Sequence, residues 1–265
     1  ITNRKQSETH LVGEVGDEKA SHSFNFRSDG SIRNTTIFTY EGGLSAAAAD
    51  ADDALVLQTT YKDEVTDFDN ITNRKQSETH LVGEVGDEKA SHSFNFRSDG
   101  SIRNTTIFTY EGGLSAAAAD ADDALVLQTT YKDEVTDFDN ITNRKQSETH
   151  LVGEVGDEKA SHSFNFRSDG SIRNTTIFTY EGGLSAAAAD ADDALVLQTT
   201  YKDEVTDFDN ITNRKQSETH LVGEVGDEKA SHSFNFRSDG SIRNTTIFTY
   251  EGGLSAAAAD ADDAL

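Results

Sequence analysis

Acidic side chains are the densest chemical feature of this sequence. Seven carboxylates fall between positions 50 and 69, and Lys62 is the only base among them. Carboxylate oxygens are the hard ligands that Ca²⁺ prefers, so this segment is the predicted calcium site. It is not an EF-hand, because the glycine and the closing glutamate of that loop are missing. The alternative is an acidic face that contacts only water. The predicted ligands are Asp50, Asp52, Asp53, Asp63, Glu64, Asp67 and Asp69.

His10 and His22 are the next residues with metal chemistry. The sequence has no Cys, so a zinc site would need both imidazoles and a carboxylate. Their spacing matches no fixed ligand geometry. We therefore expect His22 to pack or hydrogen-bond beside Phe24 on the face of a strand.

Ser, His and Asp all occur, but in no motif that would assemble a catalytic site. There is no nucleophile elbow, no phosphate-binding glycine loop and no His-Glu-x-x-His helix. Gly13 and Gly16 form only a Gly-x-x-Gly fragment, with no helix predicted after it. We expect no enzymatic activity, and Ca²⁺ as the one bound cofactor.

A 70-residue unit, repeated without substitution, organises these residues. The segment that begins at Ile1 starts again at Ile71, Ile141 and Ile211, and the sequence ends at Leu265. It opens and closes inside a unit, and so reads as a piece of a longer array. Units this poor in apolar residues depend on their neighbours, so the expected partners are adjacent repeats and other copies of the chain. The predicted domains are a partial unit, 1–55, and three whole units, 56–125, 126–195 and 196–265.

The composition excludes several classes of function. The chain has 48 acidic and 23 basic side chains, for a formal charge of −25. Such a charge repels phosphate backbones and anionic membranes, so we expect no nucleic-acid partner. No apolar run approaches the length of a membrane-spanning helix, so we expect no membrane insertion. The absence of Cys is compatible with a secreted protein, and the absence of Pro excludes polyproline stalks.

Alternating residues predict a β-hairpin across positions 21–41. His22, Phe24 and Phe26 share one strand face, and Asp29-Gly30 is a strong hairpin-turn signal. Further strands are expected at 9–15, with a bulge at Gly13, at 54–61 and at 65–72. The alanine-rich segment 45–53 predicts one or two helical turns or an ordered loop. The fold class is therefore mainly β: a tandem array of identical 70-residue β-rich units with at most one short helix each, elongated or filamentous.

The segment from Phe24 to Ile32, followed by Tyr40, resembles the aromatic-x-aromatic, Asp-Gly hairpins of bacterial Rhs/YD-repeat shells. The likeness covers less than a third of the unit, and the repeat of that family is much shorter. At class level the chain resembles the tandem-repeat region of a large secreted or cell-surface adhesin or fibre-forming protein. That resemblance implies an extracellular or cell-surface location. Asn34 and Asn70 begin N-glycosylation acceptor sequences.

Three hypotheses follow for function. The first is a structural extracellular tandem-repeat protein, a spacer, stalk or filament segment, rigidified by Ca²⁺ at acidic junctions. The second is a self-assembling cross-β or β-solenoid fibre protein, in which cations or low pH would have to screen the aligned charges. The third is a closed, propeller-like ring that binds a ligand at its centre.

Overall fold

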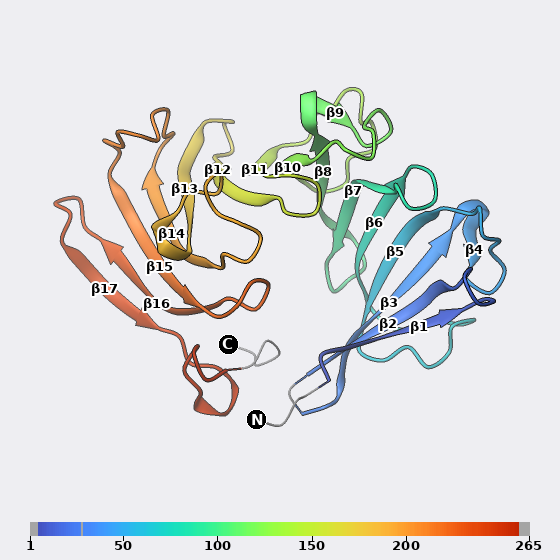
Figure 1. The fold of residues 1–265 in the computed structure, drawn as a ribbon. Helices are drawn as coiled ribbons and strands as arrows, with labels where there is room; N and C mark the ends of the chain where they lie inside the picture. The colour runs from blue at the N-terminus through green and yellow to red at the C-terminus, as the bar shows by residue number, and fades with distance from the viewer. Residues whose placement is uncertain (1–4, 28, 260–265) are drawn as a thin grey trace. The chain divides into compact units, whose positions relative to one another are not determined.

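The computed structural model describes residues 5–27 and 29–259, and they are mostly β-strands joined by turns (Figure 1). The helical elements in this part of the chain are three-residue 3-10 turns, one for each Glu-Gly-Gly sequence. None of its helices is long and apolar enough to cross a membrane. The predicted fold class, mainly β with at most one short helix per unit, is confirmed. The elongated or filamentous arrangement of the units stays a prediction.

The first two repeats run through the same order of elements, the third lacks the two-residue strand, and the fourth is described as far as its 3-10 turn and the loop after it. The first repeat contains β1 (Ser7–Val12), β2 (Lys19–Phe26), β3 (Ile32–Tyr40), η1 (Glu41–Gly43), β4 (Leu44–Ser45) and β5 (Leu55–Lys62). The second contains β6 (Lys75–Val82), β7 (Lys89–Phe96), β8 (Ile102–Tyr110), η2 (Glu111–Gly113), β9 (Leu114–Ser115) and β10 (Leu125–Lys132). The third contains β11 (Lys145–Val152), β12 (Lys159–Phe166), β13 (Ile172–Tyr180), η3 (Glu181–Gly183) and β14 (Leu195–Lys202). The fourth contains β15 (Lys215–Val222), β16 (Lys229–Phe236), β17 (Ile242–Ile247) and η4 (Glu251–Gly253).

The chain forms two compact units, residues 1–122 with 130–143 and residues 123–129 with 144–265. In the first, the long strands pair antiparallel in the order β1, β2, β3, β5, β6, β7, β8. In the second, the order is β11 to β17 without interruption. Each unit is thus an antiparallel meander that contains one junction between repeats, β5–β6 or β14–β15. The division of the chain into 70-residue domains stays a prediction.

The hairpin predicted across 21–41 is confirmed as β2 and β3. Their register pairs His22 with Ile37 and Asn25 with Asn34. In the turn, Asp29 Oδ1 accepts the backbone N–H of Ser31 at 2.8 Å, and Gly30 has a φ of 82°. A positive φ is easily reached only by glycine, which is why Asp-Gly marks this turn.

Four β-bulges interrupt the alternation in the first repeat and at its junction with the second. The register shifts leave Ser21, Arg33, Val56 and Gln76 as the extra residues of their strands. The bulge predicted at Gly13 is wrong, because β1 ends at the preceding residue and Gly13 opens a turn. There its φ is 127°, and an added Cβ would lie 2.6 Å from the carbonyl oxygen of residue 17.

Three further predictions had different outcomes. The strand expected at 54–61 is β5, shifted by one residue. The strand expected at 65–72 is absent, because Asp67 Oδ1 accepts the N–H groups of Asp69 and Asn70 and folds the chain into a turn. Segment 45–53 contains no α-helix and is an ordered loop of turns, in which Ala48 and Ala49 donate to the carbonyl of Ser45.

The core lies at the two ends of the strands, while most side chains on the sheet faces are half-buried. We call one end the alanine end. It carries the β1–β2 turn and loop 41–54, and Tyr40, Ala46 and Ala54 are buried there. The other, the arginine end, carries the β2–β3 turn and segment 63–74, where Thr35 and Val65 are buried. A core this small explains why repeats that share strand pairing stabilise one another.

Candidate functional site: the repeat junction and an arginine-lined groove

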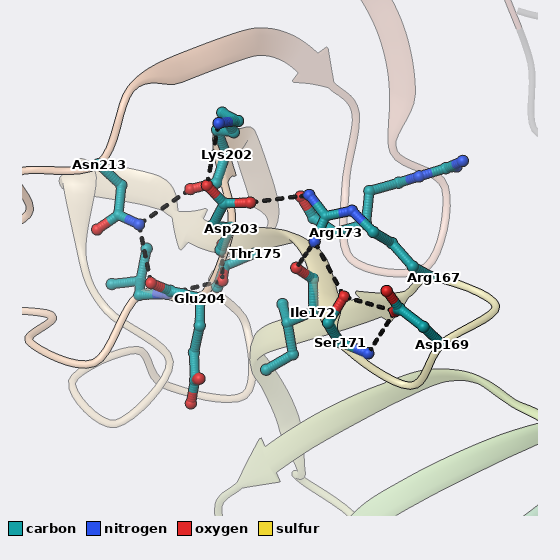
Figure 2. Close-up of polar contacts among 11 residues, drawn as sticks. Arg167, Asp169, Ser171, Ile172, Arg173, Thr175, Lys202, Asp203, Glu204 and Asn213 are labelled. Atoms are coloured by element: carbon teal, nitrogen blue, oxygen red, sulfur yellow. Dashed lines mark hydrogen bonds and ion pairs between the residues drawn. The ribbon is translucent and has the colours of Figure 1, made fainter.

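At the arginine end, a side chain from one repeat reaches back into the repeat before it. Asn213 belongs to the fourth repeat, and its Nδ2 donates to the carbonyls of Lys202 at 2.9 Å and Glu204 at 2.8 Å (Figure 2). Lys202 also donates its backbone N–H to the carbonyl of Arg214 at 2.8 Å. The end of β14 is therefore fixed by the repeat that follows it.

Thr175 secures the same turn from the inside. Its Oγ1 donates to the carbonyl of Asp203 and accepts the N–H of Val205, both at 2.9 Å. Thr175 is 0% exposed and Val205 1% exposed. The hydroxyl thus satisfies two backbone groups at a turn where Asp203 has a φ of 61°.

Asp203 is engaged in ion pairs. Its Oδ1 accepts a hydrogen bond from Arg167 at 2.8 Å, and its other oxygen lies 3.2 Å from the ammonium of Lys202. The hydrogen bond from Arg167 is the main reason that the pKa of Asp203 is lowered. Arg167 also donates to the carbonyl of Ile172 and, at 3.3 Å, to Ser171 Oγ (Figure 2). This guanidinium has a structural role in closing the turn.

The alanine end joins consecutive repeats by a second contact. Glu88 Oε1, from the second repeat, accepts the N–H of Leu55 at 3.0 Å, and Glu228 accepts that of Leu195 at 3.1 Å. These backbone groups stand at the first residue of β5 and of β14. Both ends of the last strand of a repeat are therefore held by the next repeat.

The seven predicted calcium ligands divide between the two ends of β5. Asp50, Asp52 and Asp53 lie in the loop before the strand, and the other four follow its last residue. An eight-residue strand is roughly 26 Å long, so one ion could not contact both groups. Of the second group, Asp63 pairs with Arg27 at 2.8 Å.

Among residues 5–27 and 29–259, no three or more His, Asp or Glu side chains are grouped to hold a metal ion. Asp53 and Asp67 instead accept backbone N–H groups of their own loops, at 2.7 and 3.1 Å. Calcium binding stays a prediction, to be tested in solution.

The two histidines of a repeat stack across neighbouring strands. The rings of His80 and His92 lie 4.4 Å apart with 9° between their planes, and Phe94 and Phe138 pack against His92 at 5.0 and 4.6 Å. The equivalent contact of His22 with Phe24 confirms the predicted packing. Burial is the main cause that lowers the pKa of His92 to about 4, so this ring is neutral at neutral pH. Rings stacked in parallel do not direct their nitrogens at one ion.

A groove that the sequence did not indicate lies at the arginine end of the third repeat. Its volume is about 440 Å³, and it lies over β11, β12 and β13. The lining residues are basic, amide-bearing or aromatic, with one serine: Arg144, Gln146, Asn165, Phe166, Arg167, Ser168, Arg173 and Asn174. The fourth repeat has the equivalent groove, of about 480 Å³, lined by Arg214, Gln216, Asn235, Phe236, Arg243 and Asn244.

Two bulges help to shape the groove of the fourth repeat. Gln216 is the extra residue of β15 opposite β14, and Arg243 is the extra residue of β17 opposite β16. A bulge interrupts the in-out alternation of a strand and redirects its side chains. Both redirected side chains line the same groove.

The arginines of the groove differ in their contacts. Arg167 is held by Asp203, whereas the side chain of Arg173 extends away from that network (Figure 2). Within the described residues, Arg144 and Arg173 make no ion pair or side-chain hydrogen bond. The same holds for Arg214 and Arg243. Each groove therefore presents two guanidinium groups whose donors are available to a ligand.

The chain matches no protein-family model and no curated protein sequence. Among solved structures, it is similar to a porin-like protein from Bacteroides uniformis ATCC 8492. The identity is 9% and the TM-score 0.32, over 94% of this chain and 84% of that one. It is also similar to a chain of TcdB2-TccC3-Cdc42, with 10% identity and a TM-score of 0.17, over 94% of this chain and 15% of that one. Both TM-scores are too low to support an inference, so function is argued from the chain's own residues.

Proposed function

We propose that the chain is a structural tandem-repeat protein, a spacer, stalk or filament segment of a secreted or cell-surface protein such as an adhesin. The observation that carries this is the pairing of β5 with β6 and of β14 with β15, by which the last strand of one repeat becomes an interior strand of the next. Every added repeat contributes four more strands to the meander. At a strand spacing of ~4.8 Å, this is roughly 19 Å of sheet per repeat.

The side-chain contacts at the junction support this role. Asn213 and Glu228 both belong to the following repeat and both satisfy backbone groups of β14 or of the turn after it. A repeat without its neighbour would leave these groups to water and would expose the backbone edge of β14 that pairs with β15, while β14 stays paired with β13. The repeats should therefore fold and resist unfolding as a coupled array.

The location and the absence of catalysis are parts of the proposal. An extracellular or cell-surface setting agrees with identical tandem units, a charge of −25 and the lack of Cys. The available arginines and the stacked histidines are not arranged as a nucleophile with its base. We therefore propose no enzymatic role, and other copies of the chain as the main partners.

Small-angle X-ray scattering of the 265-residue chain tests the spacer role. We expect a particle with one long dimension, unchanged by a tenfold change in protein concentration. A compact particle of equal dimensions would contradict the spacer and favour the closed ring. Growth with concentration or at low pH would favour the self-assembling fibre, which sedimentation velocity would confirm.

The same experiment tests calcium. Scattering is recorded with millimolar Ca²⁺, with Mg²⁺ at equal ionic strength, and with chelator. Stiffening by Ca²⁺ alone would support rigidification at the acidic segments. Identical curves would reject calcium without affecting the spacer role, because the junction contacts described above use only protein groups.

A further inference from the structure

We propose that the groove at the arginine end binds a carboxylate-bearing sugar residue, one in the third repeat and one in the fourth. This inference is independent of the spacer role, since the groove is a feature of the sheet surface. It starts from Arg144 and Arg173, whose guanidinium groups line the groove of the third repeat without a protein partner among the described residues.

The available arginines are unexpected in a chain with 48 acidic side chains. In the third repeat, the arginine end has five basic residues and five carboxylates, whereas the alanine end has seven carboxylates and one lysine. The five basic residues are Arg144, Lys145, Arg167, Arg173 and Lys202, and the five carboxylates are Asp169, Asp203, Glu204, Asp207 and Asp209. Arginine presents a planar fork of donors that matches a carboxylate with two parallel hydrogen bonds. Two such forks in one groove indicate an anionic group as the ligand.

The other lining residues indicate what carries that group. The amides of Gln146, Asn165 and Asn174 can each donate and accept, as sugar hydroxyls require. The two asparagines bond to each other through one N–H···O contact of 2.9 Å, which leaves further amide positions available. Phe166 also lines the groove; the Lys145 ammonium lies over one side of its ring, 5.3 Å from the centroid, so the C–H groups of a sugar ring would contact the rest of the ring. The volume, about 440 Å³, is within the usual range for a small ligand.

A peptide fits the site less well. An extended peptide binds by adding to an unpaired strand, but β12 is paired on both sides and β13 pairs with β12 and β14. The groove also lacks the apolar pocket that would select a peptide side chain. A long polyanion would be opposed by the chain's charge of −25, whereas a short sugar acid adds little repulsion.

Repetition gives the groove a second property. The equivalent strands β11 and β15 are four strands apart, so the grooves of the third and fourth repeats are roughly 19 Å apart along the sheet. Two short, separate sugar acids can therefore be bound together, one in each groove, without the long polyanion that the charge of the chain opposes. Individually weak contacts would then give a strong attachment.

Isothermal titration of the full chain tests the proposal with three probes: digalacturonate, its dimethyl ester and sodium acetate. We expect digalacturonate to bind, the neutral ester to bind at least about tenfold more weakly, and acetate not to bind measurably at the same concentration. Equal binding of the ester would overturn the role of the carboxylate. Equal binding of acetate would overturn sugar recognition and leave a simple anion site. Tighter binding of a diglutamate peptide would assign the groove to peptides instead.

Variants locate the binding. Replacing the bulge arginines Arg33, Arg103, Arg173 and Arg243 by Gln should reduce digalacturonate affinity at least about tenfold, and replacing them by Lys should reduce it less, because charge remains without the fork. The control is Lys62→Gln, Lys132→Gln and Lys202→Gln, at the same end but outside the groove lining, which should keep the affinity. Circular dichroism checks that each variant folds. Retained binding in the folded Arg→Gln variant would refute the site.

Discussion

The imidazole rings of His80 and His92 stack face to face, with 4.4 Å between their centroids. Neither ring can gain a proton without placing a charge beside the other. His80 Nε2 is buried without a hydrogen-bond partner in the described part of the chain, so water does not solvate a charge there. This pair links the stability of the repeats to pH.

Stability should fall as pH falls from about 6.5 to about 4. The pKa of His92 and of His162 is lowered from 6.5 to about 4 in the folded chain, mainly by burial. Between these values the unfolded chain binds more protons, so acid favours unfolding, and the loss is complete below the folded pKa. We expect the melting temperature to drop by roughly 5 °C over this window. Calorimetry at constant ionic strength measures it.

Replacing His92 and His162 by Gln should reduce that pH dependence, whatever it does to the stability at pH 7. His22, His80 and His150, whose pKa values are also lowered by burial, keep a smaller slope of the same sign. The carboxylates with lowered pKa values, such as Asp133 and Glu8, lose their contribution mainly as the pH falls below their ordinary values of 3.8 and 4.5, near and beyond the acid end of this window. An unchanged slope between pH 6.5 and 4 in the variant would show that other groups cause the effect.

The junction asparagines should contribute to stability although they are not in the core. Replacing Asn73, Asn143 and Asn213 by Ala removes two side-chain hydrogen bonds at each site, and we expect a loss of about 1 kcal/mol per site in urea unfolding. The matched control replaces Asn70, Asn140 and Asn210, which lie three residues earlier and make backbone contacts only. Equal losses in the two variants would mean that the junction contact has no special role.

The hydroxyl of Thr175 should contribute more to the stability of the fold than its methyl group does. Thr175→Val keeps the shape but leaves the carbonyl of Asp203 and the N–H of Val205 without their partner, which costs about 1–3 kcal/mol for each buried group. Thr175→Ser keeps both hydrogen bonds and loses one methyl group, so it should cost less. Denaturant unfolding of the two variants compares them. If the serine variant is the less stable, packing decides at this position.

Local signals were sufficient to predict the hairpin of β2 and β3, because Asp29-Gly30 and the alternation around it act within one short segment. Local signals failed where the structure depends on the register between neighbouring strands. The bulges at Arg33 and Gln76 exist only relative to the register of a neighbouring strand, and the sequence of one strand does not contain that register.

The candidate sites show the same limit of local signals: closeness in sequence does not give closeness in space. The acidic residues from Asp50 to Asp69 are close in sequence, but the length of β5 separates them in space. The groove has the opposite character: Arg144 and Arg173 are 29 positions apart and come together only through the pairing of β11, β12 and β13. The one local signal for it was the presence of arginines on either side of the Asp-Gly turn.

The last test compares two glycines of the turn between β6 and β7. Both have a positive φ, but only one of them has room for an added Cβ. Gly83 has a φ of 127°, and an added Cβ would lie 2.5 Å from the carbonyl oxygen of Asp87; Gly86 has a φ of 90° and nothing within 4 Å. Gly86→Ala should therefore cost only the conformational penalty of about 1–2 kcal/mol. Gly83→Ala should cost clearly more, since the clash is with backbone and the turn must move. Urea unfolding of the two variants measures the difference, and equal costs would show that the turn opens without effect on β6 and β7.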